Sequence, residues 1–206
     1  MTLVLGLTGS IGMGKSVTAQ LFRQAGVAVH DADATVHALY RGEAAPLIEA
    51  AFPGTTKAGV VDRALLAQAV LADATALARL ERIVHPLVGN ARDAFLSAAV
   101  GRAERVVVLD VPLLFETGAA TLVDAVVVVT TSEAVQKARV LAREGMTQER
   151  FEAILTKQLP DSEKRRCAHF LIDSGRGLDE AKAQVDGVLR AVAAMTGHSA
   201  RRFAQG

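Results

Sequence analysis

A glycine-rich segment near the N-terminus combines the residue types that bind phosphate. The sequence GSIGMGKS begins at Gly9 and ends at Ser16, with Gly12, Gly14 and Lys15 between them. Glycines let the backbone turn tightly and point successive N–H groups at one place. The lysine is a mobile cation for the β- and γ-phosphates, and the serine hydroxyl is a ligand for Mg²⁺. The pattern G-x-x-x-x-G-K-[ST] therefore predicts a loop that binds a nucleoside triphosphate.

The segments on either side of this loop decide between a phosphate site and a chance match on a glycine turn. An apolar run at Leu3–Leu7 predicts a strand, and Val17–Gln24 has the pattern of a helix that Gly26 ends. A helix that begins at the loop directs the positive end of its dipole at the same phosphate. This context favours the phosphate site.

Two aspartates follow the next predicted strand, Val27–Asp31. Asp31 and Asp33 lie in the sequence HDADATVH. Ligands bind at the carboxyl ends of parallel strands, and a carboxylate there can accept the proton of an attacking hydroxyl. Either aspartate could instead cap the following helix. Spacing alone does not separate these two interpretations.

A third carboxylate ends the strand that precedes VPLLFE. Asp110 follows four apolar residues, as the acidic residue of a Walker B strand does, and predicts an Mg²⁺ contact that is direct or through water. Pro112 excludes a continuing central strand. Leu113 and Leu114 could line an apolar pocket or belong to the core. Glu116 fits either a position near the site or a helix cap.

A basic segment from Gln136 onward predicts a lid. Arg139 and Arg143 are four residues apart and are expected to share a helix face, with Gly145 ending that helix and another beginning at residue 147 or 148. Arginines on a helical hairpin can exclude water from a phosphate site and stabilise the transferring phosphoryl group. The basic run that follows is interpreted as a solvated surface: Lys164, Arg165 and Arg166.

The remaining elements complete an alternating pattern. Val-rich runs at 105–110 and 124–130 and a short run at 170–173 predict buried strands, while residues 62–101, 132–143 and 178–194 predict helices. Asp62 and Ser132 are candidate N-caps, and Pro86 is expected to break or kink its helix. The order predicts an α/β three-layer fold around a parallel sheet with right-handed crossovers. The tail after Gly197 is expected to be frayed.

Composition favours a single soluble unit. The chain has 206 residues, a net charge of +1 and one cysteine, Cys167, which cannot form an internal disulfide. No uncharged apolar run approaches the ~18–20 residues of a membrane span. Only 4% of residues are aromatic, so the interleaved basic and aromatic stripe of a nucleic-acid binder is missing. We expect a cytoplasmic protein without nucleic-acid or membrane partners.

Taken together, these stretches resemble the dephospho-CoA kinase family over nearly the whole chain. The resemblance is carried by the segments LGLTGSIGMGKS, DAD, IVHPLV, DVPLLFE, QKARVLAR and FLIDSG. It implies a P-loop NTPase fold with a five-stranded parallel sheet. The core would span about residues 1–36, 103–140 and 167–197, with a helical substrate-binding insertion at about 37–102 and a lid at about 141–166. It also implies transfer of the γ-phosphoryl group of ATP to the ribose 3′-hydroxyl of dephospho-CoA, with Mg²⁺.

The resemblance assigns roles to individual residues. Asp33 would be the catalytic base, with Lys15, Arg139 and Arg143 acting on the transferring phosphate. ATP would contact these residues: Thr8, Gly9, Gly12, Met13, Gly14, Lys15, Ser16, Val17 and Arg143. The acceptor would contact Asp33, His85, Leu113, Leu114 and Glu116, and the metal would contact Ser16 and Asp110. Considered without the family, His85 beside Pro86 fits a hydrogen-bonded histidine in a kinked helix.

Three positions depart from the family pattern. Val17 stands where threonine is common, Ser174 stands in the stretch near the adenine where asparagine is common, and His169 replaces an aspartate. The first leaves the proposed metal ligand Ser16 in place.

A monomer or small homo-oligomer is expected. The alternatives are another small-molecule kinase, acting on a nucleoside monophosphate or shikimate, and a nucleotide-sensing regulator that transfers no phosphate.

Overall fold

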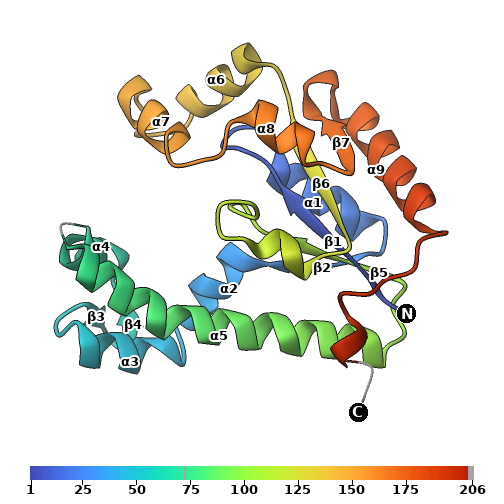
Figure 1. Ribbon diagram of the computed structural model, residues 1–206. Helices are drawn as coiled ribbons and strands as arrows, with labels where there is room; N and C mark the ends of the chain where they lie inside the picture. The colour runs from blue at the N-terminus through green and yellow to red at the C-terminus, as the bar shows by residue number, and fades with distance from the viewer. Residues whose placement is uncertain (72, 204–206) are drawn as a thin grey trace. The chain divides into compact units, whose positions relative to one another are not determined.

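The computed structural model describes residues 1–71 and 73–203, in two compact units. The larger unit comprises residues 1–30 and 97–206, and the smaller unit comprises residues 31–96. The larger unit contains the sheet and the phosphate loop, and the smaller unit is mainly helical. Figure 1 shows the course of the chain through both.

Five strands of the described residues form one sheet in the order β2-β5-β1-β6-β7. Their bounds are β1 Leu3–Thr8, β2 Ala28–Asp31, β5 Val106–Asp110, β6 Ala125–Thr130 and β7 Phe170–Asp173. The pairs β1–β5, β1–β6 and β6–β7 are parallel. The Val-rich strands are buried along almost their whole length, as expected for parallel strands covered on both faces. The predicted fold class is confirmed.

Two helices cover one face of the sheet. They are α1 (Lys15–Gln24) and α9 (Leu178–Val192), and Figure 1 shows them packed against the same side. Their apolar residues form one core with alternate residues of the central strands: Leu3, Leu5, Leu7, Ala19, Phe22, Val127, Val129, Val185 and Val188. On β6, the intervening Val126 and Val128 pack instead with Leu114, from the loop after β5. Both faces of β6 are therefore packed against apolar side chains.

A helical hairpin follows β6. It consists of α6 (Glu133–Leu141) and α7 (Gln148–Leu155), and α8 (Asp161–Arg166) then leads to β7. The hydroxyls of Ser132 and Thr147 cap the two hairpin helices by accepting from Val135 and Arg150 N–H. Short 3₁₀ turns lie at Ala119–Leu122 (η1), Ser174–Arg176 (η2) and Arg201–Phe203 (η3).

The smaller unit is a helical cluster with its own core. Its elements are α2 (Ala32–Leu39), α3 (Ala44–Ala51), the antiparallel pair β3 (Thr56–Lys57) and β4 (Val60–Val61), α4 (Arg63–Val70) and α5 (Ala74–Gly101). The last helix continues into the larger unit. Buried side chains from all the helices meet in the core, among them Leu39, Ile48, Phe52, Leu66 and Val84. Asp62 caps α4, as predicted.

Two local expectations, on Pro86 and on Arg143, are corrected by the structure. Of the expected break or kink at Pro86, the break does not occur, because α5 runs continuously through that residue. Apolar residues on either side of it, such as Val84 and Leu87, pack in the core of the smaller unit. The helix α6 ends at Leu141, so Arg143 does not share a face of it with Arg139. A turn begins there instead, in which Arg143 N–H donates to Val140 O at 3.1 Å.

The C-terminal segment is also better ordered than expected. The backbone N–H groups of His198 and Ser199 donate to Asp124 Oδ1 at 2.7 and 2.8 Å. Ala200 is 3% exposed. The expectation of a frayed tail is therefore wrong for residues 198–203, because a side chain distant in sequence supplies the acceptors. Residues 204–206 lie outside the described part of the chain.

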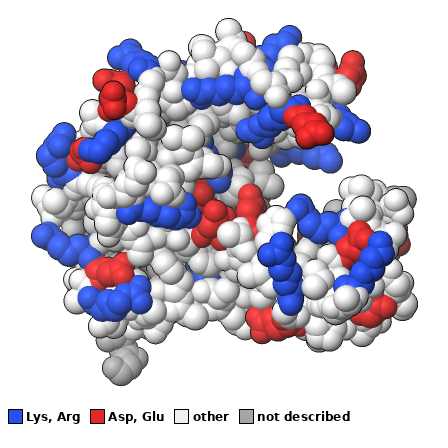
Figure 2. All heavy atoms as spheres, turned by 180° about the vertical axis from the view of Figure 1, so that it is seen from behind, with Lys and Arg blue, Asp and Glu red and all other residues white. Residues whose placement is uncertain are grey.

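Charged side chains of both signs are interspersed on the face shown in Figure 2, without one continuous basic stripe there. This agrees with the net charge of +1. In the parts of the chain that the structure describes, helices with the length and apolar character of a membrane span are absent.

Candidate active site

The phosphate loop adopts a backbone that only glycine accommodates easily at two positions. Gly12 has a φ of 78° and Gly14 a φ of 91°, both in the left-handed region. A Cβ on Gly12 would lie 2.5 Å from Val140 Cγ2, and one on Gly14 would lie 2.7 Å from Ser174 Oγ. The loop is therefore enclosed by α6 and the turn after β7. Gly14 immediately precedes α1, whose first N–H groups point into the loop region.

The lysine of the loop is held by the carboxylate at the end of β5. Lys15 Nζ lies 2.6 Å from Asp110 Oδ1, and their side chains are 15% and 3% exposed. The contact follows from the sheet, because β1 and β5 are parallel neighbours and Leu7 is in register with Asp110. Both groups therefore lie at the carboxyl edge of the sheet, where ligands of such folds bind.

The other residues expected around ATP differ in exposure. Thr8 is buried, and its hydroxyl donates to Pro112 O at 2.9 Å. Met13 is buried, while Ser16 and Val17 are exposed at the start of α1. A Cβ on Gly9 would lie 2.7 Å from Val129 O, so glycine allows β6 to approach the loop closely.

The donor set at the loop fits a magnesium ion. Mg²⁺ is usually held by one or two protein oxygen ligands together with substrate phosphates and water. Ser16 offers an exposed hydroxyl directly after Lys15, and Asp110 offers a carboxylate beside the same lysine. The described residues contain no cluster of three or more acidic, histidine or cysteine side chains that could hold a metal without a substrate.

The two aspartates after β2 have different surroundings. Asp31 Oδ1 accepts from Ala34 N–H at 2.9 Å and caps α2. Asp33 lies in the first turn of α2 and lines a cavity of about 400 Å³ within the smaller unit. The alternative of a capping role therefore applies to Asp31, and Asp33 has its carboxylate at a cavity.

This cavity also brings together polar residues that the sequence analysis left without a role. His37, Tyr40 and Arg63 line it with Asp33, and Arg63 Nη1 lies 3.1 Å from His37 Nε2. Burial raises the pKa of the Tyr40 hydroxyl. Arg63 is far from Asp33 in sequence and belongs to no motif, so only the packing of α2 against α4 reveals the pairing. His85 is exposed on α5 and does not line this cavity.

The loop after β5 separates its two leucines. Leu113 is 38% exposed, whereas Leu114 is fully buried. Leu114 packs with Val126 and Val128, and its Cδ2 would lie 2.9 Å from a Cβ on Gly6. For Leu114 the structure therefore shows the core position that the sequence analysis left open. Its side chain packs the loop after β5 onto strand β6.

Glu116 anchors the chain that returns from the hairpin. Its Oε1 accepts from Leu159 N–H at 2.7 Å and lies 2.9 Å from Lys164 Nζ. Burial by itself would raise the pKa of Glu116, but the Lys164 ammonium and backbone N–H groups outweigh it and hold the pKa below its ordinary value. Of the two alternatives for Glu116, the structure shows no helix cap, because its carboxylate contacts Leu159 N–H and Lys164 instead.

The expectation of a solvated basic run at residues 164–166 is wrong for Lys164. Its side chain is 0% exposed, while Arg165 and Arg166 are exposed. One turn of α8 buries the first residue of the run beneath the loop after β5. A basic run in the sequence gives no sign of which member faces the core.

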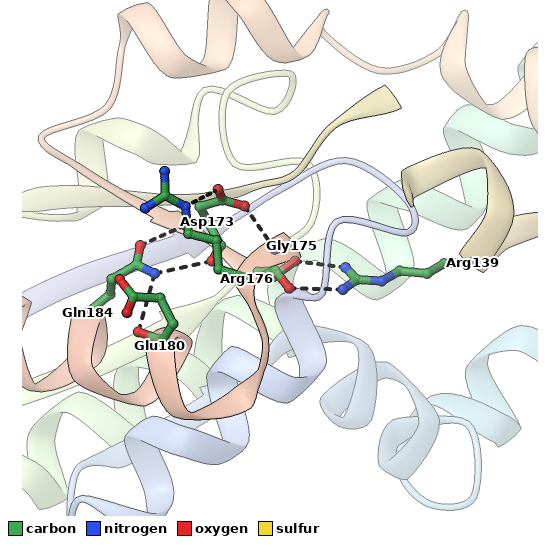
Figure 3. Close-up of polar contacts among 7 residues, drawn as sticks. Arg139, Asp173, Gly175, Arg176, Glu180 and Gln184 are labelled. Atoms are coloured by element: carbon green, nitrogen blue, oxygen red, sulfur yellow. Dashed lines mark hydrogen bonds and ion pairs between the residues drawn. The ribbon is translucent and has the colours of Figure 1, made fainter. Parts of the chain in front are cut away.

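Arg139 is held against the turn after β7 (Figure 3). Its Nη1 donates to Ser174 Oγ at 2.7 Å and its Nη2 donates to Ser174 O at 2.9 Å. Ser174 Oγ in turn donates to Met13 O at 2.7 Å. Arg139 thus reaches the phosphate loop through one serine, at the position where the family commonly has asparagine. Arg143 lies exposed beyond the end of α6.

Several hydrogen bonds hold the turn itself. Asp173 Oδ1 accepts from Gly175 N–H at 2.8 Å, and Gln184 both accepts from Asp173 N–H at 2.8 Å and donates to Asp173 O at 3.1 Å (Figure 3). His169, another of the three departures from the family pattern, accepts from Val126 N–H through Nδ1 at 3.1 Å. Of the three departures, Ser174 and His169 therefore make hydrogen bonds within the protein, whereas Val17 is exposed at the start of α1.

Comparison with protein families gives one result over most of the chain. The family model described as dephospho-CoA kinase matches residues 3–180. A dephospho-CoA kinase of Rhodopseudomonas palustris (strain HaA2) is 60% identical over 193 residues, which are 94% of this chain and 97% of that protein. A dephospho-CoA kinase of Mesorhizobium japonicum is 61% identical over 187 residues, 91% of this chain and 95% of that protein.

A solved structure is similar to this one over nearly the whole chain. A crystal structure of a protein from Thermus thermophilus is 32% identical in sequence and has a TM-score of 0.79. The match covers 95% of this chain and 99% of that one.

Proposed function

The chain belongs to the dephospho-CoA kinase family, and on that premise we propose how its residues carry out the reaction. The activity is that of a kinase: the γ-phosphoryl group of ATP passes to the ribose 3′-hydroxyl of dephospho-CoA, giving coenzyme A and ADP. The observation that carries this conclusion is the family match over residues 3–180, which spans the phosphate loop, the aspartates after β2 and the helical hairpin.

ATP is proposed to bind with its phosphates in the loop between Gly9 and Ser16. The left-handed glycines and the start of α1 support this, because they present N–H groups and a positive dipole end to an anion. Lys15 would move from Asp110 onto the β- and γ-phosphates. Since phosphoryl transfer requires little covalent chemistry from the protein, positioning and charge neutralisation would supply most of the catalysis.

Mg²⁺ is proposed to be held by Ser16 and Asp110 together with the ATP phosphates. When bound, the ion neutralises charge on the β- and γ-phosphate oxygens. Asp110 lies 2.6 Å from the Lys15 ammonium in this structure. It would therefore stay near that ammonium after Lys15 turns toward the phosphates.

The smaller unit, residues 31–96, overlaps most of the insertion predicted at about 37–102 and is proposed to bind the acceptor. Its cavity of about 400 Å³ supports this, because Asp33 lines it beside apolar side chains and Arg63. Asp33 would accept the proton of the 3′-hydroxyl as that oxygen attacks phosphorus. His85, Leu113 and Glu116 remain proposed acceptor contacts.

The α6–α7 hairpin is proposed to be the lid, with Arg139 and Arg143 directed at the phosphates in the closed state. The bond of Arg139 to Ser174 supports a position beside the loop. Closure would exclude water, which otherwise competes with the acceptor hydroxyl.

The partners are proposed to be small molecules, and the protein a cytoplasmic monomer or small homo-oligomer. Interspersed surface charge and the single exposed cysteine, Cys167, support this.

The test is a direct assay of product. Purified protein is incubated with Mg²⁺, ATP and dephospho-CoA, and mass spectrometry follows coenzyme A and ADP. We expect a Mg²⁺-dependent gain of one phosphate by the acceptor, lowered about 10²- to 10³-fold in Lys15→Ala by loss of a charge-stabilising group. Lys182→Ala, on the outer face of α9, is the matched control.

Two other outcomes would overturn the assignment. If dephospho-CoA stays unmodified while a nucleoside monophosphate or shikimate gains phosphate, the protein is a different small-molecule kinase. If ATP binds and no acceptor of the panel is phosphorylated, a nucleotide sensor is the better description.

A further inference from the structure

One residue of the phosphate loop is held by two glutamines from opposite ends of the hairpin. The N–H of Ile11 donates to Gln158 Oε1 at 3.1 Å, and the carbonyl of Ile11 accepts from Gln136 Nε2 at 2.7 Å. Gln136 lies near the start of α6, and Gln158 lies between α7 and α8. The hairpin therefore begins and ends on the same loop residue.

The chemistry of the backbone determines which way each amide group faces. An N–H can only donate and a carbonyl oxygen can only accept, so Gln158 must present its oxygen and Gln136 its NH₂ group. Gln136 is 5% exposed, which makes its hydrogen bond costly to lose. The two contacts are thus not interchangeable.

Close packing reinforces the connection on the α6 side. A Cβ on Gly12 would lie 2.5 Å from Val140 Cγ2 and 3.0 Å from Gln136 O, so α6 rests directly on the loop backbone. A shift of α6 would therefore be transmitted to the loop through both the hydrogen bond and this contact.

The return side is anchored as well. Leu159, next to Gln158, donates its N–H to Glu116 at 2.7 Å. Glu116 belongs to the loop that follows Asp110, the partner of Lys15. Gln158 is thus held to the core on one side while it contacts the phosphate loop on the other.

We propose that Gln136 and Gln158 are positioning residues that make the placement of the hairpin and the shape of the phosphate loop a single equilibrium. The inference rests on the proposed binding of ATP in this loop. With either bond lost, the loop populates its binding-competent shape less often, and apparent ATP affinity falls by that fraction. By linkage, ATP bound in the loop stabilises the position of the hairpin in which Gln136 and Gln158 are both bonded to Ile11.

The test compares methionine variants, which keep the length of glutamine and remove its hydrogen bonds. Gln136→Met, Gln158→Met and the double variant are assayed for ATP dissociation constant, kcat and both KM values. Gln148→Met is the matched control, because Gln148 lies on the same hairpin and donates only within α7, to Glu152. Deuterium uptake of residues 141–158 is measured with and without ATP.

We expect each single variant to weaken ATP binding about three- to tenfold, the range of one hydrogen bond. The KM for dephospho-CoA should change less than about twofold, which corresponds to well under 1 kcal/mol, because these glutamines contact the phosphate loop and not the proposed acceptor site. The double variant should bind ATP about as weakly as the more affected single variant. The reason is that losing either hydrogen bond already releases the backbone of Ile11 from the hairpin. Protection of the hairpin by ATP should shrink in all three and persist in Gln148→Met.

Replacement by glutamate gives a second readout in the protein without nucleotide. Glu at position 158 still accepts from Ile11 N–H, whereas Glu at position 136 cannot donate to the carbonyl. We expect Gln158→Glu to keep the low deuterium uptake of the loop and Gln136→Glu to raise it.

The inference is overturned if the methionine variants only lose thermal stability and bind ATP normally, or if the two single effects multiply in the double variant. If instead the wild-type protein binds no ATP, or Lys15→Ala binds it unchanged, the proposed ATP site fails and this inference fails with it.

Discussion

Asp31 and Asp33 are the same residue type two positions apart, yet their carboxylates have different partners. Asp31 accepts a hydrogen bond from Ala34 N–H in the first turn of α2, and Asp33 lines the cavity of the smaller unit. This division makes the pair its own control, because asparagine caps a helix about as well as aspartate but cannot act as a base.

For Asp33→Asn we expect kcat to fall by about 10²- to 10⁴-fold, the usual contribution of a general base. The ATP dissociation constant should stay close to that of the wild type, since the proposed triphosphate contacts are other residues. Asp31→Asn should keep nearly full kcat. Steady-state kinetics of coenzyme A formation measure both, and an Asp33→Asn enzyme with full kcat would rule out the base assignment.

Gly12 combines two demands on one residue, a left-handed backbone and room for α6. Gly59 has nearly the same φ, 76° against 78°, but nothing lies within 4 Å of its Cβ position. Comparing the two alanine variants therefore separates backbone strain from steric clash.

We expect Gly59→Ala to cost about 1–2 kcal/mol of unfolding free energy, the penalty of a left-handed residue. Gly12→Ala should cost at least about 1 kcal/mol more, because Val140 and the loop must shift to relieve the overlap, and it should also weaken ATP binding. Urea denaturation and ATP titration measure the two effects. Equal losses of stability would show that the loop yields easily to α6.

At the scale of elements, Glu116 and Lys164 connect the loop after β5 with α8. The lysine is fully buried and the glutamate side chain is 17% exposed. Removing one partner of such a pair leaves a buried charge without compensation, whereas removing both can be nearly neutral.

We expect Glu116→Gln to lower the unfolding free energy by about 3 kcal/mol at neutral pH, near the lower end for a broken buried pair. Adding Lys164→Met should restore much of the loss. Glu163→Gln, which breaks an exposed pair with Arg166, is the matched control and should cost less than about 1 kcal/mol. A double variant as unstable as Glu116→Gln would contradict this account.

The same pair gives a pH dependence. Because the pKa of Glu116 is lower in the folded than in the unfolded chain, its contribution is complete above the unfolded pKa and is lost as pH falls through the folded pKa. The difference in stability between wild type and Glu116→Gln should therefore shrink in acid, below the ordinary pKa of a glutamate. Denaturation curves at neutral and acidic pH measure it; a constant difference would contradict the lowered pKa.

At the scale of the whole chain, Asp124 joins segments from both ends. It accepts from Val4 N–H at 2.8 Å and from the N–H groups of His198 and Ser199. The C-terminal segment is thereby attached to the first strand through a residue in the middle of the sequence.

We expect Asp124→Ala to lower the unfolding free energy by about 3 kcal/mol, because several backbone N–H groups lose an acceptor at once. The kinetic constants should stay unchanged where the protein remains folded, since the carboxyl edge of the sheet is untouched. Asp186→Ala, which removes only an exposed pair with Lys182, should cost about 0–1 kcal/mol. Thermal denaturation and the product assay together measure this, and altered ATP affinity would contradict it.

Much of the fold could be predicted because its signals are local. The Val-rich runs at β5 and β6, the caps at Asp62 and Ser132 and the glycine spacing of the phosphate loop each depend on neighbouring residues. Their positions in the structure differ from the predicted ones by a residue or two. The short strands β3 and β4 and the helix α8 carried no signal strong enough to predict.

The sequence by itself determined the phosphate loop, the α/β class and the family, because each rests on residue types at fixed spacing along the chain. Only the tertiary structure decided which of several equivalent residues faces the core or the cavity. Lys164 rather than Arg165 is buried, Asp33 rather than Asp31 lines the cavity, and two distant glutamines meet at Ile11. These choices depend on contacts between segments far apart in sequence, which local patterns do not encode.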